Sequence, residues 1–183
     1  EIKFDKHVGG ESPIEQHQRN ELINGIKNAD QNDIIILSDS DEIPDLNKLS
    51  EIKEGKKFIA FSQKMFMYKL NLQNLEESNW IGSRITKKKN IKSFQDLRNL
   101  KFKNYPFWRL DKKNLQIIKG GWHFSFLQKP EDIITKIKSF SHGECNVPEN
   151  TDANHLQQKI DAYIHPTNNN KLTKVEIDNS FPK

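Results

Sequence analysis

The sequence predicts a single α/β domain, and three observations support that prediction. The continuous apolar run at 34–37 is typical of a strand covered on both faces in an α/β sheet. Upstream, Ser12-Pro13-Ile14-Glu15 has the spacing of a capping box with proline at the first helical position, which predicts the start of a helix. The chain has 183 residues, of which 34% are hydrophobic, enough for one core of ordinary size, and it shows no internal repeat or linker.

The first half of the chain is expected to alternate helices with strands. The helix that begins at the capping box is expected to run to about Ala29. A short helix at 46–54 should end at Gly55, because glycine readily takes the backbone conformation that terminates helices. Besides 34–37, runs rich in apolar and aromatic residues predict strands at 2–4, 57–63, 65–70 and 80–86. The strands at 57–63 and 65–70 are expected to form a hairpin.

The second half is expected to hold three helices and at least two strands. Apolar residues spaced by three and four predict an amphipathic helix at 130–140, with weaker helical patterns at 93–100 and 152–164. Strands are expected at 115–118 and 122–127, separated by Gly120-Gly121, where glycine permits a bulge or the close approach of a ligand. We expect the domain to span 1–164, followed by a tail at 165–183 with one late strand at 174–178.

Charge and cysteine content limit the classes of function. The net charge of +4 comes from 29 basic and 25 acidic residues, which argues against a dedicated nucleic-acid binder and suits an anionic small substrate. No apolar run approaches the roughly 20 residues of a membrane span. The lone Cys145 can form no internal disulfide, so we expect a reducing, cytoplasmic location.

In the segment DIIILSDSDEIPD the apolar run at 34–37 leads into three acids, Asp39, Asp41 and Glu42, and Asp45 follows them. Clustered carboxylates repel one another unless a cation neutralises them. If the chain stays extended, Asp39 and Asp41 point the same way, since alternate strand residues share a face. Such a pair suits Mg²⁺ or Mn²⁺, which keeps positions open for substrate phosphates. The alternative is that these acids, with Glu42 and Asp45, only cap the helix that opens near Pro44.

The segment GGWHFSF offers further candidates. His123 is a possible third metal ligand or a hydrogen-bond donor to a phosphate, and the alternative is a histidine hydrogen-bonded inside the fold. Trp122 is a candidate to stack against the apolar C–H face of a ligand such as a sugar, although a core tryptophan explains it equally well. For Trp80 the core interpretation is favoured.

The order of five motifs resembles glycosyltransferase family 17. These motifs are QHQRNELINGIKNADQNDIIILSDSDEIPD, WIGSRIT, SFQDLRNL, GGWHFSF and KIKSFSHGECN. The resemblance implies a GT-A-like (Rossmann-like) α/β fold with a mixed sheet flanked by helices. The usual first strands of that fold are expected to be missing, or to be kept only as a remnant at residues 2–4. It also implies inverting transfer of a sugar, N-acetylglucosamine above all, from a UDP-sugar donor to a glycan acceptor. In that pattern Asp39 and Asp41 match the acidic metal-binding motif, while Arg19 and Asn20 belong to the donor-side motif.

Four polar residues are expected to bind the donor beside Asp39. Arginine's planar fork suits a diphosphate, which makes Arg19, with its neighbour Asn20, and Arg84 and Arg98 candidates. Each arginine has a simpler explanation as a surface residue paired with a nearby acid.

Inverting transfer also needs a base near the acceptor hydroxyl, because the proton must leave during attack. Glu144 and Asp96 are the candidates for this base. Asp96 has an alternative role in capping its helix, and Glu144 one as a solvated loop acid.

Two other classes of protein compete with the enzyme. One is a non-catalytic carbohydrate-binding or partner-binding relative of the same fold. The other is a single-stranded nucleic-acid binder built on the lysine-rich stretches at 87–89 and 101–103, although a solvated basic face is the commoner meaning of such stretches.

Overall fold

The computed structural model describes most of the chain. The described residues are 13–77, 79–103, 105–106, 108–139 and 147–182. The strand expected at 2–4, the capping serine at position 12 and the catalytic candidate Glu144 lie outside them.

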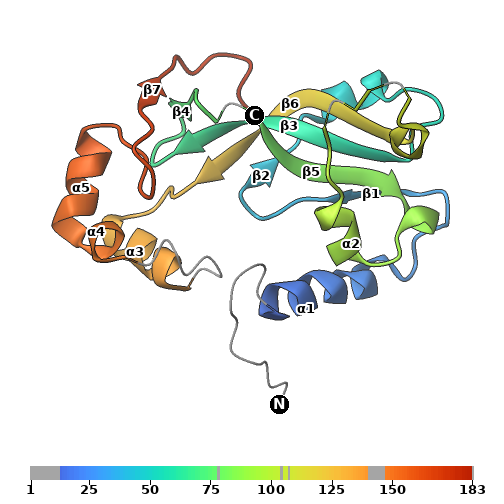
Figure 1. Cartoon of the computed structure of the whole chain (residues 1–183), viewed down its shortest axis with the longest axis horizontal. Coiled ribbons are helices and arrows are strands. Elements are labelled where there is room, and N and C mark those ends of the chain that lie inside the picture. Colours follow the sequence, from blue (N-terminus) through green and yellow to red (C-terminus); the bar gives the residue numbers. More distant parts are fainter. Residues whose placement is uncertain (1–12, 78, 104, 107, 140–146, 183) are drawn as a thin grey trace. The chain divides into compact units, whose positions relative to one another are not determined.

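Figure 1 shows the helices and strands of the described residues, coloured in chain order. The strands are β1 (Ile34–Leu37), β2 (Glu42–Ile43), β3 (Phe58–Met67), β4 (Leu72–Asn74), β5 (Trp80–Lys87), β6 (Leu115–Ser125) and β7 (Leu172–Lys174). The α-helices are α1 (Pro13–Glu21), α2 (Phe94–Asn99), α3 (Pro130–Ser139), α4 (Pro148–Thr151) and α5 (Ala153–Asp161). Four short 3₁₀ helices are η1 (Leu22–Ile26), η2 (Leu46–Glu51), η3 (Lys88–Asn90) and η4 (Leu110–Lys112).

Within the described residues, seven strands form one hydrogen-bonded sheet in the order β1-β5-β3-β4-β7, with β6 paired to β3 and β2 paired to β6. Most neighbours are antiparallel. β3 and β6 run parallel, because Phe58 N donates to Asn114 O at 3.1 Å where both begin and Tyr68 N donates to Ser125 O at 3.2 Å where both end. The predicted α/β class, with a mixed sheet flanked by helices, is confirmed.

The described chain divides into two compact units, and both long strands, β3 and β6, pass from one into the other. The strand unit comprises 19–64, 79–123 and the described residues of 179–183. The helical unit comprises the described residues of 1–18, 65–78 and 124–178.

In the strand unit, apolar residues pack on both faces of the sheet. One face carries a cluster of Ile59, Phe61, Ile85 and Ile118, against which Leu49 and Ile52 of the η2 region pack. The other face carries Leu37 with Phe94 and Leu97 of α2, and the neighbouring residues Ile26, Ile35, Phe58, Ile91 and Leu100 pack around them. Adjacent residues 58 and 59 serve opposite faces, as strand alternation requires.

In the helical unit, α3 and α5 bury their apolar stripes. Ile133, Ile137 and Leu156 are fully buried, so the predicted amphipathic helix at 130–140 is confirmed. The ring of Phe66 stacks on that of Phe124 with centroids 5.3 Å apart. Within the described residues, no helix has the length and apolar character needed to cross a bilayer.

Several predicted elements were wrong in extent. The apolar run at 34–37 is not covered on both faces: β1 pairs only with β5 among the described strands, and Ile34 and Ile36 are 57% and 38% exposed. The two strands expected at 57–63 and 65–70 are one continuous strand, β3, because Gln63 is buried within it and bonds Ser83 of β5 instead of marking a turn.

Other elements shift for local reasons. β6 is also continuous through Gly120-Gly121, since Gly121 takes a φ of +100° and lets the strand pass close to the backbone of Ile43, Pro44 and Asp45. The helix that starts at Pro13 changes to 3₁₀ geometry after Glu21 and ends at Ile26. The element expected at 46–54 is also a 3₁₀ helix, η2. The late strand is β7, a few residues earlier than predicted.

Candidate active site

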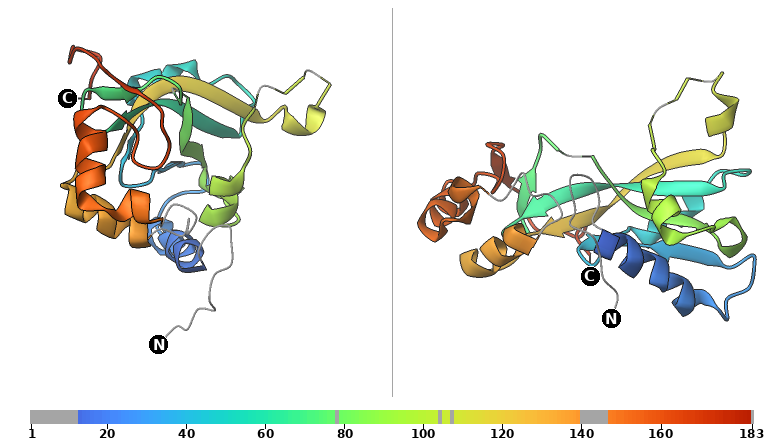
Figure 2. Two further views of the ribbon diagram at one scale, coloured as in Figure 1. Left: turned by 60° about the vertical axis from the view of Figure 1, so that its left-hand side comes forward. Right: turned by 60° about the horizontal axis from the view of Figure 1, so that its bottom comes forward.

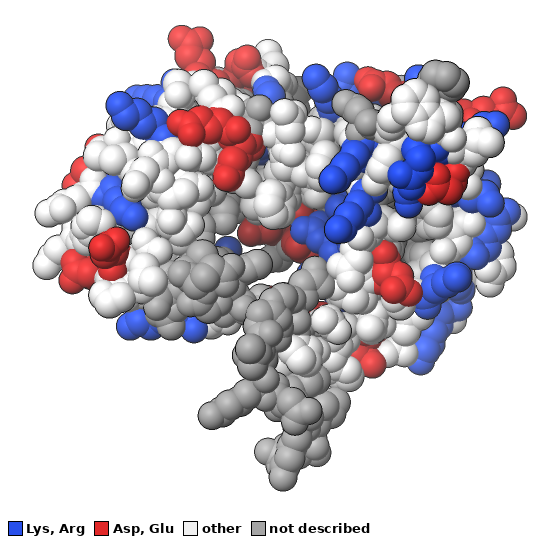
Figure 3. Space-filling model, viewed as in Figure 1, with Lys and Arg blue, Asp and Glu red and all other residues white. Residues whose placement is uncertain are grey.

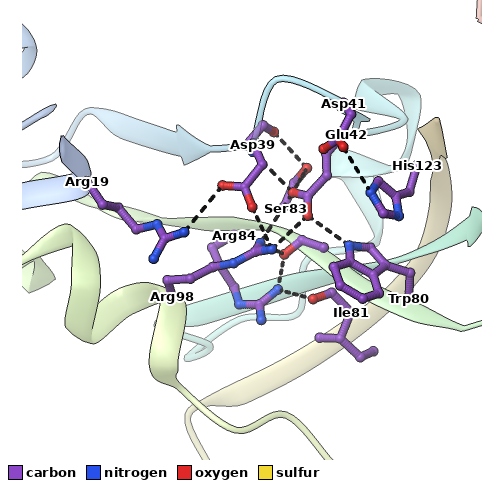
Figure 4. A network of polar contacts seen from close by, with 12 residues as sticks. Arg19, Asp39, Asp41, Glu42, Trp80, Ile81, Ser83, Arg84, Arg98 and His123 are labelled. Carbon is purple, nitrogen blue, oxygen red and sulfur yellow. Dashed lines mark hydrogen bonds and ion pairs between the residues drawn. The ribbon is translucent and has the colours of Figure 1, made fainter. Parts of the chain in front are cut away.

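The acidic segment after β1 forms a tight turn, not an extended strand. Glu42 N donates to Asp39 O at 3.0 Å, which closes a four-residue turn before β2 begins. Serine and aspartate favour such turns because their side chains bond nearby backbone groups. The expectation that Asp39 and Asp41 point the same way is therefore wrong: Figure 4 shows their carboxylates directed to different partners.

Glu42 lies at the centre of a buried polar network (Figure 4). Its carboxylate accepts hydrogen bonds from Trp80 Nε1 at 2.8 Å, from Arg98 Nη2 at 2.9 Å and from Ser83 Oγ at 3.4 Å. Only 5% of the residue is exposed, so these donors replace water as its solvation. Glu42 is not among the residues predicted from the sequence to bind donor or metal, although its place beside the two aspartates was a usable signal.

Asp39 lies between two arginines. Its carboxylate is 2.8 Å from Arg98 Nη2 and 3.9 Å from Arg19 Nη2. Burial raises the pKa of Asp39 above its ordinary value of 3.8, and the positive charge of Arg98 opposes that shift. Arg98 bridges Asp39 and Glu42, so the predicted donor residues Asp39, Arg19 and Arg98 are brought together.

Helix α2 positions both arginines. Ser93 caps it by accepting from Asp96 N at 2.9 Å, and Arg98 in its last turn points at the acidic turn (Figure 4). From the same helix, Gln95 Oε1 accepts from Arg19 Nη1 at 2.7 Å. Asn20 Oδ1 accepts from Gln95 N at 3.1 Å, which satisfies a backbone donor at the start of the helix. Asn20 thus tethers α1 to α2, and Gln95 is a positioning residue that sequence reasoning missed.

Arg84 is a buried cation beside this network. Its Nη1 donates to Ile81 O at 2.9 Å and to Gly82 O, and the guanidinium lies 5.0 Å from the ring centroid of Phe102. Its Nε has no hydrogen-bond partner among the described residues. Burial lowers the pKa of Arg84 to about 10, and repulsion from Arg98 adds to that effect. Arg84 therefore contributes positive charge to the site from strand β5.

His123 faces Asp41 on the other side of the turn. His123 Nε2 is 3.4 Å from Asp41 Oδ2, and the imidazole stacks on Trp80 with centroids 4.6 Å apart and planes 19° from parallel. The backbones of His123 and Glu42 pair where β2 meets β6. Trp122, the neighbour of His123 on β6, is half-buried and pairs with Ile43. The tryptophan that contacts the polar network in the described structure is Trp80, through Glu42 and His123.

Gly82 gives the network its room. A Cβ at this position would overlap the side chain of Gln63 and come within 3.0 Å of Glu42 Cδ. Gln63 is fully buried and holds Ser83 from both sides, accepting from Ser83 N at 3.3 Å and donating to Ser83 Oγ at 3.2 Å. The Gly-Ser pair of WIGSRIT thus lets β5 pass directly under the acidic turn.

The predicted metal ligands are only partly assembled. Asp41 and His123 fit a divalent ion, because an oxygen and a nitrogen 3.4 Å apart can both bond one cation at about 2.1 Å. The carboxylate of Asp39 is turned toward the arginines instead. Among the described residues, no three His, Cys, Asp or Glu side chains converge as a metal-binding group.

The two predicted catalytic acids are not part of the described network. Asp96 is exposed in the first turn of α2, about 200° around the helix from Arg98. The cap of this helix is the Ser93 hydroxyl, which accepts from the backbone N–H of Asp96. Glu144 lies outside the described residues.

The comparison with protein families agrees with the resemblance drawn from the motifs. The sequence model of glycosyltransferase family 17 matches residues 6–164, which include every residue of the network. No curated protein and no solved structure matches the chain. Because the match covers most of the 183 residues, the predicted family is confirmed, and the chain is a glycosyltransferase that belongs to glycosyltransferase family 17.

Proposed function

We propose that this glycosyltransferase moves a sugar, N-acetylglucosamine, from a UDP-sugar donor to a glycan acceptor with inversion, and that it requires Mn²⁺ or Mg²⁺. The observation that carries the proposal is the convergence of Arg98 and Arg19 on Asp39 at the end of β1. Paired guanidinium groups over a carboxylate form a charged surface that a metal-bound diphosphate matches in size and charge.

The arginines have a direct role in this proposal. Arg98 already contacts two carboxylates, those of Glu42 and Asp39, and Glu42 is fixed in turn by Trp80 and Ser83. When a diphosphate approaches, Arg98 and Arg19 can turn N–H groups toward its oxygens while Glu42 keeps Arg98 in place. A cation held this way needs little reorganisation, which favours binding of the charged leaving group.

The divalent ion has candidate ligands in the acidic turn and on the neighbouring strand β6. Asp41 and His123 would hold it, Asp39 would join them once its carboxylate turns from the arginines, and a bound ion would supply Lewis-acid stabilisation of the departing diphosphate. Stacking on Trp80 fixes the plane of the His123 ring and so holds its Nε2 toward Asp41. Trp122, half-buried on the same ladder, stays a candidate for contact with a sugar of the donor.

Deprotonation of the acceptor requires a base, and Glu144 and Asp96 are the proposed candidates. Glu144→Gln and Asp96→Asn each remove one ionisable group and keep the side-chain shape. The variant that lacks the base should lose transfer at saturating substrate while still binding the donor.

Thermal unfolding with UDP, with and without Mn²⁺, tests the donor site. A ligand at 100 times its Kd adds about 2.7 kcal/mol to the free energy of unfolding. The parent should be stabilised by UDP plus Mn²⁺, and Asp39→Asn and Asp41→Asn should lose that response. Glu54→Gln is the matched control, since Glu54 is an exposed acid outside the network.

Sugar transfer from a panel of UDP-sugars then identifies the donor. Transfer from UDP-N-acetylglucosamine in preference to other donors supports the proposed sugar. A parent that binds glycans but ignores both UDP and Mn²⁺ would instead be a carbohydrate-binding relative.

A further inference from the structure

The segment 101–113, between α2 and β6, carries the excess charge of the whole chain. It holds five basic residues and one acid, a net +4 that equals the net charge of the protein. The rest of the chain is balanced, with 24 of the 29 basic and 24 of the 25 acidic residues. This segment therefore accounts for the net charge of the whole chain, while the lysine run at 87–89 is offset by acids elsewhere in the sequence.

The same segment exposes large apolar side chains. Trp108 and Leu110 are 66% and 74% exposed. Figure 2 shows η4, which contains Leu110, lying beyond the start of β6 and away from the sheet in both views. In Figure 3, basic side chains gather on the part of the surface where this segment and the neighbouring strands lie.

A cavity of about 480 Å³ is lined by this segment, by the start of β6 and by Lys56, two residues before β3. Five cationic side chains line it: Lys56, Lys103, Arg109, Lys112 and Lys113. Across the described residues, the acid that pairs with this set is Asp111, 2.8 Å from Arg109 and 3.6 Å from Lys112. The cavity therefore keeps a strong positive charge and has room for an anionic headgroup.

The aromatic rings beside the cavity are already covered by cations. Arg109 and Lys112 each lie 5.7 Å from the ring centroid of Tyr105, and Arg84 lies over Phe102. Single-stranded nucleic acids need open aromatic faces on which bases stack. The rings of Tyr105 and Phe102 instead hold cations in place, which leaves the exposed Trp108 as the aromatic side chain to be assigned to lipid or to a nucleic-acid base by the binding tests below.

We propose that the segment 101–113 docks on a membrane surface rich in anionic lipid. Tryptophan favours the headgroup level of a bilayer, and an exposed leucine beside it gains by entering the acyl boundary. Lysine and arginine around them attract anionic headgroups. Trp108 and Leu110 insert, while the cavity-lining cations bind lipid phosphate. This site lies in the strand unit but uses none of the residues of the polar network, so it is independent of the proposed reaction.

Binding to vesicles tests the proposal. The full chain should co-sediment with phosphatidylglycerol vesicles and not with phosphatidylcholine vesicles, and high salt should release it. Each basic residue near an anionic surface contributes about 1 kcal/mol, so Lys103→Glu with Lys113→Glu should weaken binding at least about 30-fold. Lys64→Glu with Lys129→Glu is the matched control, because both lysines are exposed outside the segment and the net charge changes equally.

Tryptophan fluorescence tests insertion separately from charge. The parent should show a blue shift with phosphatidylglycerol vesicles, and Trp108→Phe should remove most of it. Leu110→Ser should weaken vesicle binding at least about tenfold, because an exposed polar side chain gains nothing from the acyl boundary.

Three results would overturn the proposal. The first is absence of vesicle binding by the parent. The second is equal loss of binding in the segment variant and in its charge-matched control, which would indicate a general net-charge effect. The third is binding to a single-stranded oligonucleotide, or to glycerol 3-phosphate in solution, that exceeds binding to the vesicles.

Discussion

Glu42→Gln removes the charge at the centre of the polar network and leaves the size of the side chain almost unchanged. The wild-type carboxylate accepts from Arg98 at 2.9 and 3.3 Å and from Trp80 at 2.8 Å. Removing one member of a buried ion pair costs about 3–5 kcal/mol. Arg98 keeps Asp39 at 2.8 Å as a partner, which places the expected loss at the lower end, about 3 kcal/mol.

Urea unfolding of the parent and the variant measures this loss as a difference in the free energy of unfolding. Glu54→Gln, an exposed acid changed in the same way, should stay within about 0.5 kcal/mol of the parent. If Glu42→Gln were as mild as this control, Glu42 would not organise the network. A loss of about 3 kcal/mol with an unchanged m-value would support it.

Three further predictions concern packing and pH. Gly82→Ala should cost about 2 kcal/mol in urea unfolding, because its methyl group displaces the buried Gln63, whereas Gly25→Ala has open space and should be nearly neutral. Burial raises the pKa of Asp39 in the folded protein, so the contribution of this residue to the free energy of unfolding declines as pH rises above 3.8. Asp39→Asn lacks this decline, so its free energy of unfolding should rise relative to that of the parent between pH 4 and 7. A difference between the two proteins that stays constant with pH would contradict this. Burial lowers the pKa of His165 from 6.5 to about 4. The free energy of unfolding of the parent should therefore fall by on the order of 3 kcal/mol as pH falls across that range, and it should fall less in His165→Gln, which has no imidazole to protonate.

The α/β class, the helix at α3 and the positions of the motifs were predictable because they depend on local patterns. Ile133 and Ile137 repeat at helical spacing and are fully buried, as the periodicity indicates. The continuity of the long strands β3 and β6 was not predictable. Gln63 resembles the end of a strand, but its amide is paired with Ser83 of a strand about twenty residues away.

The candidate site was predictable in its residue types and not in its pairing. Asp39, Arg19 and Arg98 were all expected to bind the donor, and the fold brings them together. The central place of Glu42 depends on the turn that reverses the chain between β1 and β2, which a pattern of alternating acids does not reveal. Long-range partners such as Gln95, 76 residues from Arg19, leave no local signal.

The central claim is that Arg98 and the acidic turn hold the diphosphate of a UDP-sugar. Calorimetric titration of the full chain with UDP-N-acetylglucosamine in the presence of Mn²⁺ tests it most directly. We expect the parent to bind and Arg98→Lys to bind at least about tenfold more weakly, because lysine cannot reproduce the bidentate fork. Equal affinity in parent and variant would contradict the claim.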